Sequence, residues 1–248
     1  LNAAKENLSD FSNVSYLKSN FENIDKVLDD LGISKIDGAL MDIGVSSYQI
    51  DNAERGFSYM HDGPLDMRMD TSNELTAEKI VNEYSLDELQ KIFSNYGEER
   101  FSRTIARKIV ETRDEQRIDT TFKLRDLINK SIRSNEAHPE KRVFQALRIE
   151  VNRELEVLEN TLDKIIDHLN VDGRLCVITF HSLEDRIVKN TFKELEKDCI
   201  CPPGLPLCVC NHKAKIKIIN KKPIIAGKKE LKDNSRSKSA KLRVCQRI

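Results

Sequence analysis

The feature that most constrains the fold is a mostly apolar run, residues 36–45, which ends in a turn rich in Gly and Ser. A short run of this kind is typical of a strand buried in a parallel sheet. The preceding residues predict a weak strand at 14–19 and a helix at 21–31 that stops at Gly32. Strand, helix and strand in this order form a βαβ unit, so we expect an α/β sheet.

The stretch from residue 71 to residue 145 has a different pattern, because no strand-like run of any length occurs in it. Its first predicted helix opens on a capping-box pattern formed by Ser85 and Glu88. The helices predicted here lie at 85–93, 98–113 and 121–132, with a fourth that starts near Pro139. The sequence therefore predicts an all-helical insertion.

Apolar residues step by three or four from Leu147 to Leu169. This stripe predicts that the fourth helix continues over the whole stretch and lies across the sheet. Residues 173–180 predict a second buried strand, and a helix follows at 183–195. Two later β-like runs, 215–219 and 240–244, predict that the sheet ends in an antiparallel pair.

The charge is unevenly distributed, although the formal net charge is zero. Residues 211–248 contain 13 Lys and Arg against Glu230 and Asp233, which leaves this segment at +11 and the remainder at −11. Such a segment is either a contact for a polyanion or a solvated basic tail, and charge alone does not separate the two. No stretch approaches the roughly 18–20 apolar residues that a membrane span needs, so we expect no membrane partner.

Four of the six cysteines are close together as two Cys-x-Cys pairs across a Pro-rich stretch: Cys199, Cys201, Cys208 and Cys210. Zinc is one possible ligand. The spacing within each pair is one residue rather than two, so reduced structural thiols are the preferred interpretation and no metal ligand is assigned.

Short polar residues follow both predicted buried strands, where α/β sheets bind their ligands. The first strand leads to Asp42 and Gln49, and the second leads to His181. For Asp42 we prefer contact with a ligand to a role as a helix cap or turn former, because it ends a buried strand.

Residues 52–70 form a turn-rich segment that follows the first strand. Phe57 and Tyr59 could stack on a base, and Arg55 and Arg68 could hold phosphates. The alternative is that these side chains pack the segment onto the helical insertion, and residue types alone favour that alternative.

Several blocks of the sequence resemble the ribosomal RNA small subunit methyltransferase H family, also called MraW. They are residues 37–47, 52–70, 142–154, 173–188 and 234–243. The resemblance implies a class I (Rossmann-like) methyltransferase core with an inserted all-helical domain. We expect residues 1–62 and 146–248 to form the core and residues 63–145 to form the insertion.

The resemblance implies a cytoplasmic enzyme that uses S-adenosyl-L-methionine to methylate the exocyclic N4 of a cytidine in the decoding region of 16S rRNA. Its partner is the small ribosomal subunit. By similarity, Phe21 packs beside the adenine region of the cofactor, and Asp42 and Gln49 are polar contacts to it. The family's Gly-Gly-His cofactor loop has no counterpart here and the chain starts at Leu1 inside a helix-like run, so we expect an N-terminal portion to be missing.

The amino group of cytosine is a poor nucleophile, because its lone pair is delocalised into the ring. A group that accepts a hydrogen bond from it would raise its electron density and later take its proton. Our candidates for this role are Asp62 and Asp66, followed by His181.

Two other functional classes compete with this hypothesis. A nucleotide-dependent oxidoreductase would need a Gly-x-Gly-x-x-Gly turn, which is not seen in this sequence. A non-catalytic RNA-binding or ribosome-assembly module would be served equally well by the basic segment and the helical insertion.

Overall fold

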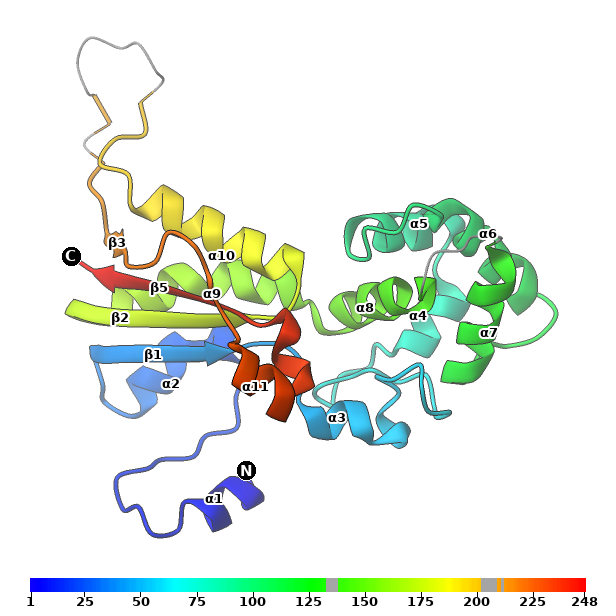
Figure 1. The fold of residues 1–248 in the computed structure, drawn as a ribbon, viewed down its shortest axis with the longest axis horizontal. Helices are drawn as coiled ribbons and strands as arrows, with labels where there is room; N and C mark the ends of the chain where they lie inside the picture. Colours follow the sequence, from blue (N-terminus) through cyan, green and yellow to red (C-terminus); the bar gives the residue numbers. More distant parts are fainter. Residues whose placement is uncertain (133–137, 202–208, 211) are drawn as a thin grey trace. The chain divides into compact units, whose positions relative to one another are not determined.

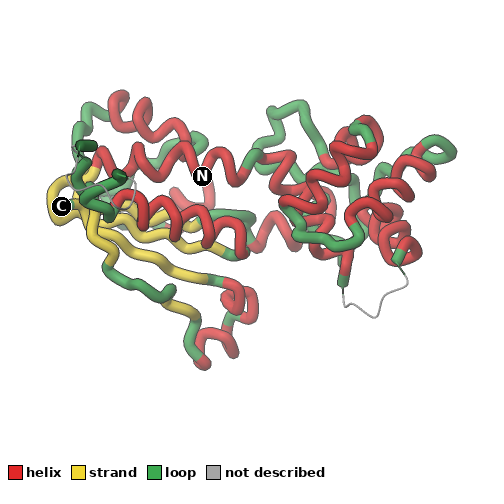
Figure 2. The backbone as a smooth tube through the Cα atoms, turned by 90° about the horizontal axis from the view of Figure 1, so that it is seen from above, coloured by secondary structure: helices red, strands yellow, loops and turns green. Residues whose placement is uncertain are grey.

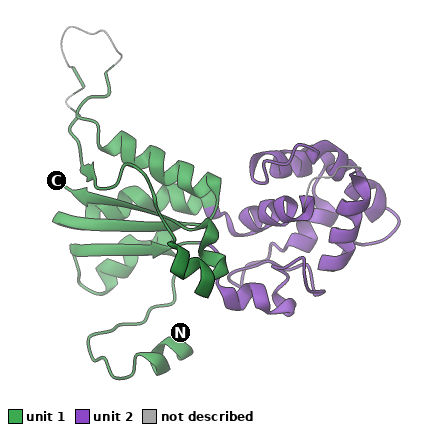
Figure 3. Ribbon diagram, in the orientation of Figure 1, with its two compact units in different colours: residues 1–43, 155–248 green, residues 44–154 purple. Residues whose placement is uncertain are grey.

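The computed structural model describes residues 1–132, 138–201, 209–210 and 212–248. The chain divides into two compact units (Figure 3). Unit 1 consists of Leu1–Ile43 and Leu155–Ile248, and unit 2 consists of Gly44–Glu154. Within the described ranges, no helix combines the length and the apolar character that a membrane crossing requires.

Unit 1 contains a mixed sheet (Figure 1). In order across the sheet, its strands are β1 (Ile36–Asp42), β2 (Leu169–Thr179), β5 (Lys241–Arg247) and β3 (Ile216–Ile218), and β4 (Ile224–Ile225) also pairs with β5. β1 and β2 are parallel, with Met41 opposite Val177. β5 is antiparallel to both β2 and β3, which confirms the predicted antiparallel pair.

Helices pack against one face of this sheet, which is formed by every second residue of its strands. The helical segments of unit 1 are α1 (Asn2–Asn7), η1 (Phe21–Asn23), α2 (Ile24–Asp30), α9 (Glu154–His168), α10 (Ser182–Leu195), α11 (Lys228–Asp233) and η3 (Ser235–Ser239). Leu162 of α9 and Phe192 of α10 share a core with Leu175 and Val177 of β2. Figure 2 shows helices lying along the strands. Leu40 on β1 points to the opposite side and is 69% exposed.

The predicted strand at 14–19 is wrong. Residues 14–20 have no regular secondary structure, and Val14 and Leu17 are exposed. A strand needs a neighbour to complete its backbone hydrogen bonds, and the described residues offer none to this segment. The parallel neighbour of β1 is β2.

Unit 2 is helical, and its described residues contain no strand. Its helical segments are α3 (Ser47–Asp51), η2 (Ala53–Arg55), α4 (Ala77–Glu83), α5 (Leu86–Asn95), α6 (Ser102–Arg113), α7 (Thr121–Ser131) and α8 (Pro139–Asn152). The predicted capping box is present, because Ser85 Oγ accepts from Glu88 N at 3.3 Å and Glu88 Oε2 accepts from Ser85 N at 2.8 Å.

The limits of unit 2 are wider than the expected insertion, 63–145, because hydrogen bonds tie both flanks to it. On the N-terminal side, Arg55 donates to the carbonyl oxygens of Arg68 and Met69. On the C-terminal side, Asn152 donates to the carbonyl oxygen of Met67 at 2.8 Å and accepts from Met69 N at 2.7 Å.

The single long helix predicted across residues 147–169 is also wrong, because α8 ends at Asn152 and α9 begins at Glu154. Arg153 between them has a left-handed backbone, with φ of 51°. Leu147 lies in the core of unit 2, whereas Leu162 lies in the core of unit 1. One continuous apolar stripe therefore serves two separate cores, and the spacing of apolar residues does not reveal the break.

Candidate functional site

The carboxyl ends of β1 and β2 lie at the same edge of the sheet, because the two strands are parallel and Asp42 is opposite Ile178. Asp42 is the last residue of β1, and its side chain is exposed. Among the described residues, no group forms a hydrogen bond or ion pair with its carboxylate. A carboxylate that serves no hydrogen bond within the described structure therefore lies where α/β sheets bind ligands.

Phe21 and Gln49 each keep part of the side chain available. Phe21 opens η1 in unit 1 after the N-cap Asn20, and it is 39% exposed. Gln49 in unit 2 completes a capping box, in which its Oε1 accepts from Ser46 N at 2.9 Å and from Ser46 Oγ at 3.0 Å. Its Nε2 has no hydrogen-bond partner in the described part of the chain, so Gln49 can act as a donor.

His181, which follows β2, is held as the N-cap of α10. Its Nδ1 accepts from Glu184 N at 3.5 Å, and its Nε2 lies 3.1 Å from Glu184 Oε1, an ion-pair distance without hydrogen-bond alignment. The other carboxylate oxygen of Glu184 accepts from Phe180 N at 2.7 Å. Capping therefore accounts for Nδ1 of His181, whereas Nε2 is buried without a hydrogen-bond partner among the described residues. The side chain is only 9% exposed, and this burial gives no support to a role on a target base.

Asp185, in the first turn of α10, forms an ion-pair network with β5. Its carboxylate accepts from Arg243 Nε at 2.6 Å and from Arg243 Nη2 at 3.1 Å, and Lys241 Nζ lies at 3.3 Å. Burial by itself would raise the pKa of Asp185, but the hydrogen bonds and charges of both cations hold the pKa below its ordinary value. No local pattern in the sequence indicates this network, because Asp185 lies more than 50 residues from both cations.

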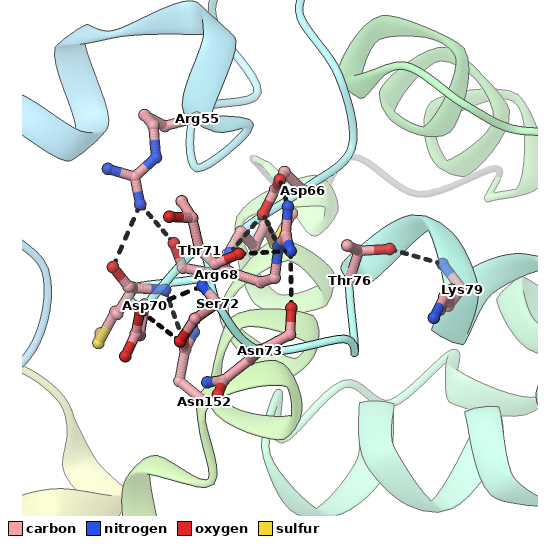
Figure 4. A network of polar contacts seen from close by, with 12 residues as sticks. Arg55, Asp66, Arg68, Asp70, Thr71, Ser72, Asn73, Thr76, Lys79 and Asn152 are labelled. Carbon is pink, nitrogen blue, oxygen red and sulfur yellow. Dashed lines mark hydrogen bonds and ion pairs between the residues drawn. The ribbon is translucent and has the colours of Figure 1, made fainter. Parts of the chain in front are cut away.

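The segment after η2 is organised around Arg68 (Figure 4). Its Nε and Nη2 donate to the two carboxylate oxygens of Asp66 at 2.8 and 2.7 Å. Its Nη1 donates to the carbonyl oxygens of Thr71 at 2.9 Å and Asn73 at 2.6 Å. Burial tends to raise the pKa of Asp66, but Arg68 outweighs it and lowers this pKa. Both side chains are thus engaged in holding the segment together.

Arg55, Phe57 and Tyr59 also have packing roles. The guanidinium of Arg55 reaches backbone carbonyls of the same segment (Figure 4), and its Cζ lies 5.7 Å from the centroid of the Phe57 ring. Phe57 is only 9% exposed and belongs to the core of unit 2. Tyr59 packs edge-on against Phe144, with 5.8 Å between ring centroids.

These placements favour the packing alternative for all four predicted RNA contacts, Arg55, Phe57, Tyr59 and Arg68. Phe57 could stack on a base only by leaving its core. A phosphate would find at most one N–H group of Arg68 unused, because four of the five have acceptors.

Asp62 differs from Asp66, because it is exposed. Its Oδ1 accepts from Phe122 N at 3.1 Å, near the start of α7, and Thr121 Oγ1 lies at 3.5 Å. The hydrogen bond from the Phe122 amide lowers the pKa of Asp62 below its ordinary value. The carboxylate therefore stays ionised while part of it faces solvent.

Sequence reasoning missed Asn152, whose side chain joins α8 to the segment that contains Arg68 (Figure 4). The usable signal was an Asn at a helix end. Such a residue seldom continues a helix and often bonds to a neighbouring backbone.

A sequence model of the MraW methylase family matches residues 1–248. The chain belongs to this family. It is 58% identical over 251 residues to the ribosomal RNA small subunit methyltransferase H of Clostridium botulinum strain Kyoto / Type A2, covering 100% of this chain and 81% of that protein. Proteins of the same name from Lachnospira eligens and Finegoldia magna are 56% and 53% identical, covering 99% and 100% of this chain and 80% and 81% of their own lengths.

Family membership confirms both the predicted family and the predicted fold class, an α/β Rossmann-like methyltransferase fold. The mixed sheet with helices packed on it agrees with that class. A methylase needs a methyl donor, and the exposed residues at the carboxyl edge of the sheet are candidates to bind it.

Proposed function

We propose that this protein transfers a methyl group from S-adenosyl-L-methionine to the exocyclic N4 of a cytidine in the decoding region of 16S rRNA. The observation that carries the proposal is the match of the whole chain to a methylase family, with relatives named for the small-subunit ribosomal RNA. Its partner is then the small ribosomal subunit, and its place is the cytoplasm, where bacterial ribosomes are found.

The residues that would hold the cofactor fit its chemistry. Asp42 offers an exposed carboxylate to N–H or O–H groups, Gln49 offers an N–H donor, and Phe21 offers an exposed ring for a nucleobase. When bound, S-adenosyl-L-methionine supplies an electrophilic methyl group on a sulfonium.

The target nitrogen must be held in line with that methyl group, about 3 Å away, before transfer can occur. A carboxylate that accepts a hydrogen bond from one N–H group of this nitrogen raises the electron density on the nitrogen and fixes its orientation. Of the three candidates, Asp66 is paired with Arg68 and His181 is buried beside Glu184, whereas Asp62 is ionised and keeps part of its carboxylate exposed. We therefore favour Asp62 for this role.

The test is methyl transfer from labelled S-adenosyl-L-methionine, with the full-length protein and small subunits that lack the modification. The expected product is N4-methylcytidine at a single position of the 16S rRNA, identified by nuclease digestion and mass spectrometry. Label on another atom, or on another RNA, would contradict the proposal. Subunit binding without any transfer would favour the non-catalytic module instead.

A further inference from the structure

Hydrogen bonds join the two ends of the connection between α10 and β3. Lys215 N donates to the carbonyl oxygen of Leu195 at 2.8 Å, and Ala214 N donates to Asp198 Oδ1 at 3.3 Å. Cys199 directly follows Asp198, so the next residues along these segments bring cysteines toward each other.

Three thiols gather at this point. The Sγ atoms of Cys199, Cys201 and Cys210 all lie within 4.8 Å of one another, and those of Cys199 and Cys210 are 3.8 Å apart. Backbone amides point at two of them: Cys201 N donates to Cys199 Sγ at 3.4 Å, and Val209 N donates to Cys201 Sγ at 3.4 Å. Cys208 lies outside the described residues, and nothing here depends on it.

The separation of the sulfur atoms matches a metal site better than a disulfide. A disulfide has an S–S length of about 2.05 Å, far shorter than the distance between Cys199 and Cys210. Four thiolates around Zn²⁺, each at about 2.3 Å in a tetrahedron, have sulfur atoms about 3.8 Å apart. The two backbone amide donors also favour a metal site, because hydrogen bonds to a thiolate stabilise its charge.

A purely structural thiol in this protein has a different environment. Cys245 on β5 is fully buried in the core of unit 1, and burial raises the pKa of its thiol to about 12. In contrast, Cys199 is exposed, and Cys201 and Cys210 are half-buried and belong to neither core. Packing explains Cys245 but leaves the three gathered thiols without a role.

We propose that Cys199, Cys201 and Cys210 bind one Zn²⁺ as thiolates, with a fourth donor completing the tetrahedron. Soft thiolate ligands select zinc over magnesium and calcium, which prefer oxygen. Binding displaces the thiol protons to solvent. The ion then joins the two ends of the connection between α10 and β3, and its role is structural. This inference is independent of the reaction proposed above, and it replaces the interpretation as reduced structural thiols.

The first experiment measures metal in the full-length protein, expressed with trace zinc and passed through a weak chelator resin. Elemental mass spectrometry should find about one zinc per chain, as for other structural zinc sites. Cobalt exchanged for zinc should give the intense absorption bands of thiolate-bound Co²⁺. Protein without stoichiometric metal, or with iron in place of zinc, would overturn the proposal.

The second experiment assigns the ligands. Cys199→Ser and Cys210→Ser should each lose most of the zinc, whereas the control Cys176→Ser should retain it, because Cys176 lies on β2 away from this cluster. Circular dichroism of each variant verifies the fold. Equal zinc in all three variants would refute the site, as would thiol titration and peptide mapping that reveal a disulfide between Cys199 and Cys210.

Discussion

Arg68 and Asp66 form a two-point ion pair within one segment, with Arg68 Nε 2.8 Å from Asp66 Oδ1 and Nη2 2.7 Å from Asp66 Oδ2. The same guanidinium donates to the carbonyl oxygens of Thr71 and Asn73 (Figure 4). The pair is partly buried, with side-chain exposures of 22% and 20%. A charged pair in this position orders the backbone that leads into α4, so its first effect is on stability.

Asp66→Asn should lower the free energy of unfolding by about 1–2 kcal/mol, because it removes a charge-assisted pair from a partly buried site. The matched control is Glu78→Gln, which breaks an exposed pair with Arg117 of the same 2.7 Å length. That change should cost clearly less than Asp66→Asn, because solvent screens a pair with side-chain exposures of 58% and 32%. Urea unfolding of both variants checks this, and equal losses would contradict the structural role assigned to Asp66.

A comparison of Asp62→Asn with Asp66→Asn should distinguish a loss of catalysis from a loss of stability. If Asp62 accepts the hydrogen bond from the target amino group, its variant loses about 100-fold or more in kcat while cofactor affinity and melting temperature stay close to the original. Asp66→Asn should instead lower the melting temperature. Single-turnover methyl transfer and cofactor titration measure these quantities. A kcat for Asp62→Asn within a few-fold of the original would remove Asp62 from the mechanism.

Asp42→Asn should weaken cofactor binding by about tenfold or more, since a charged acceptor bond is worth about 1.5–3 kcal/mol. Stability should be unchanged, because no described residue bonds to this carboxylate. Asp29→Asn, at an exposed position of α2, is the matched control and should bind cofactor normally. Calorimetric titration of the full-length protein decides the matter, and parallel effects of the two substitutions would argue against a cofactor contact by Asp42.

Much of the secondary structure was predictable, because its signals are local. The apolar run that became β1 and the capping box at Ser85 each depend on residues within one element. The placement of Asp42 followed from the same strand, since a parallel strand brings its last residue to the ligand-binding edge. These predictions needed no knowledge of distant partners.

The other features depend on partners that the sequence does not reveal. The acceptors of Arg68 include backbone carbonyls, and any residue type can supply these, so its guanidinium looked available for phosphate. Phe57 looked like a stacking platform because its residue type does not show whether a core covers it. The helix break at Arg153 left the apolar spacing intact, because the helices on both sides of it repeat apolar residues every three or four positions.

Gly56→Ala should be more destabilising than Gly32→Ala, although both glycines have nearly the same left-handed backbone, with φ of 69° and 68°. The backbone strain alone costs about 1–2 kcal/mol at either position. A Cβ at Gly56 also collides with the carbonyl oxygen of Pro64, whereas a Cβ at Gly32 meets nothing within 4 Å. The added cost is about 1–3 kcal/mol. Urea unfolding of both variants measures the difference, and equal costs would show that the segment relaxes freely.

Asp185→Asn should reveal a pH-dependent contribution to stability. Because Arg243 and Lys241 lower the pKa of Asp185 in the folded protein, its contribution is complete above the unfolded-state pKa of about 3.9. It disappears as the pH falls through the lower folded-state value. At pH 7 the variant should lose about 1–3 kcal/mol, since it leaves Arg243 half-satisfied beside the sheet.

The measurement is urea unfolding of the original protein and the Asp185→Asn variant between pH 3 and pH 7. The difference in unfolding free energy should be constant from pH 5 to pH 7 and should shrink below about pH 4, because protonation of Asp185 then removes the same charge that the substitution removes. Asp163→Asn, on the exposed side of α9, should show no such trend. A difference that stays constant down to pH 3 would mean that packing around the side chain, rather than its charge, stabilises this part of unit 1.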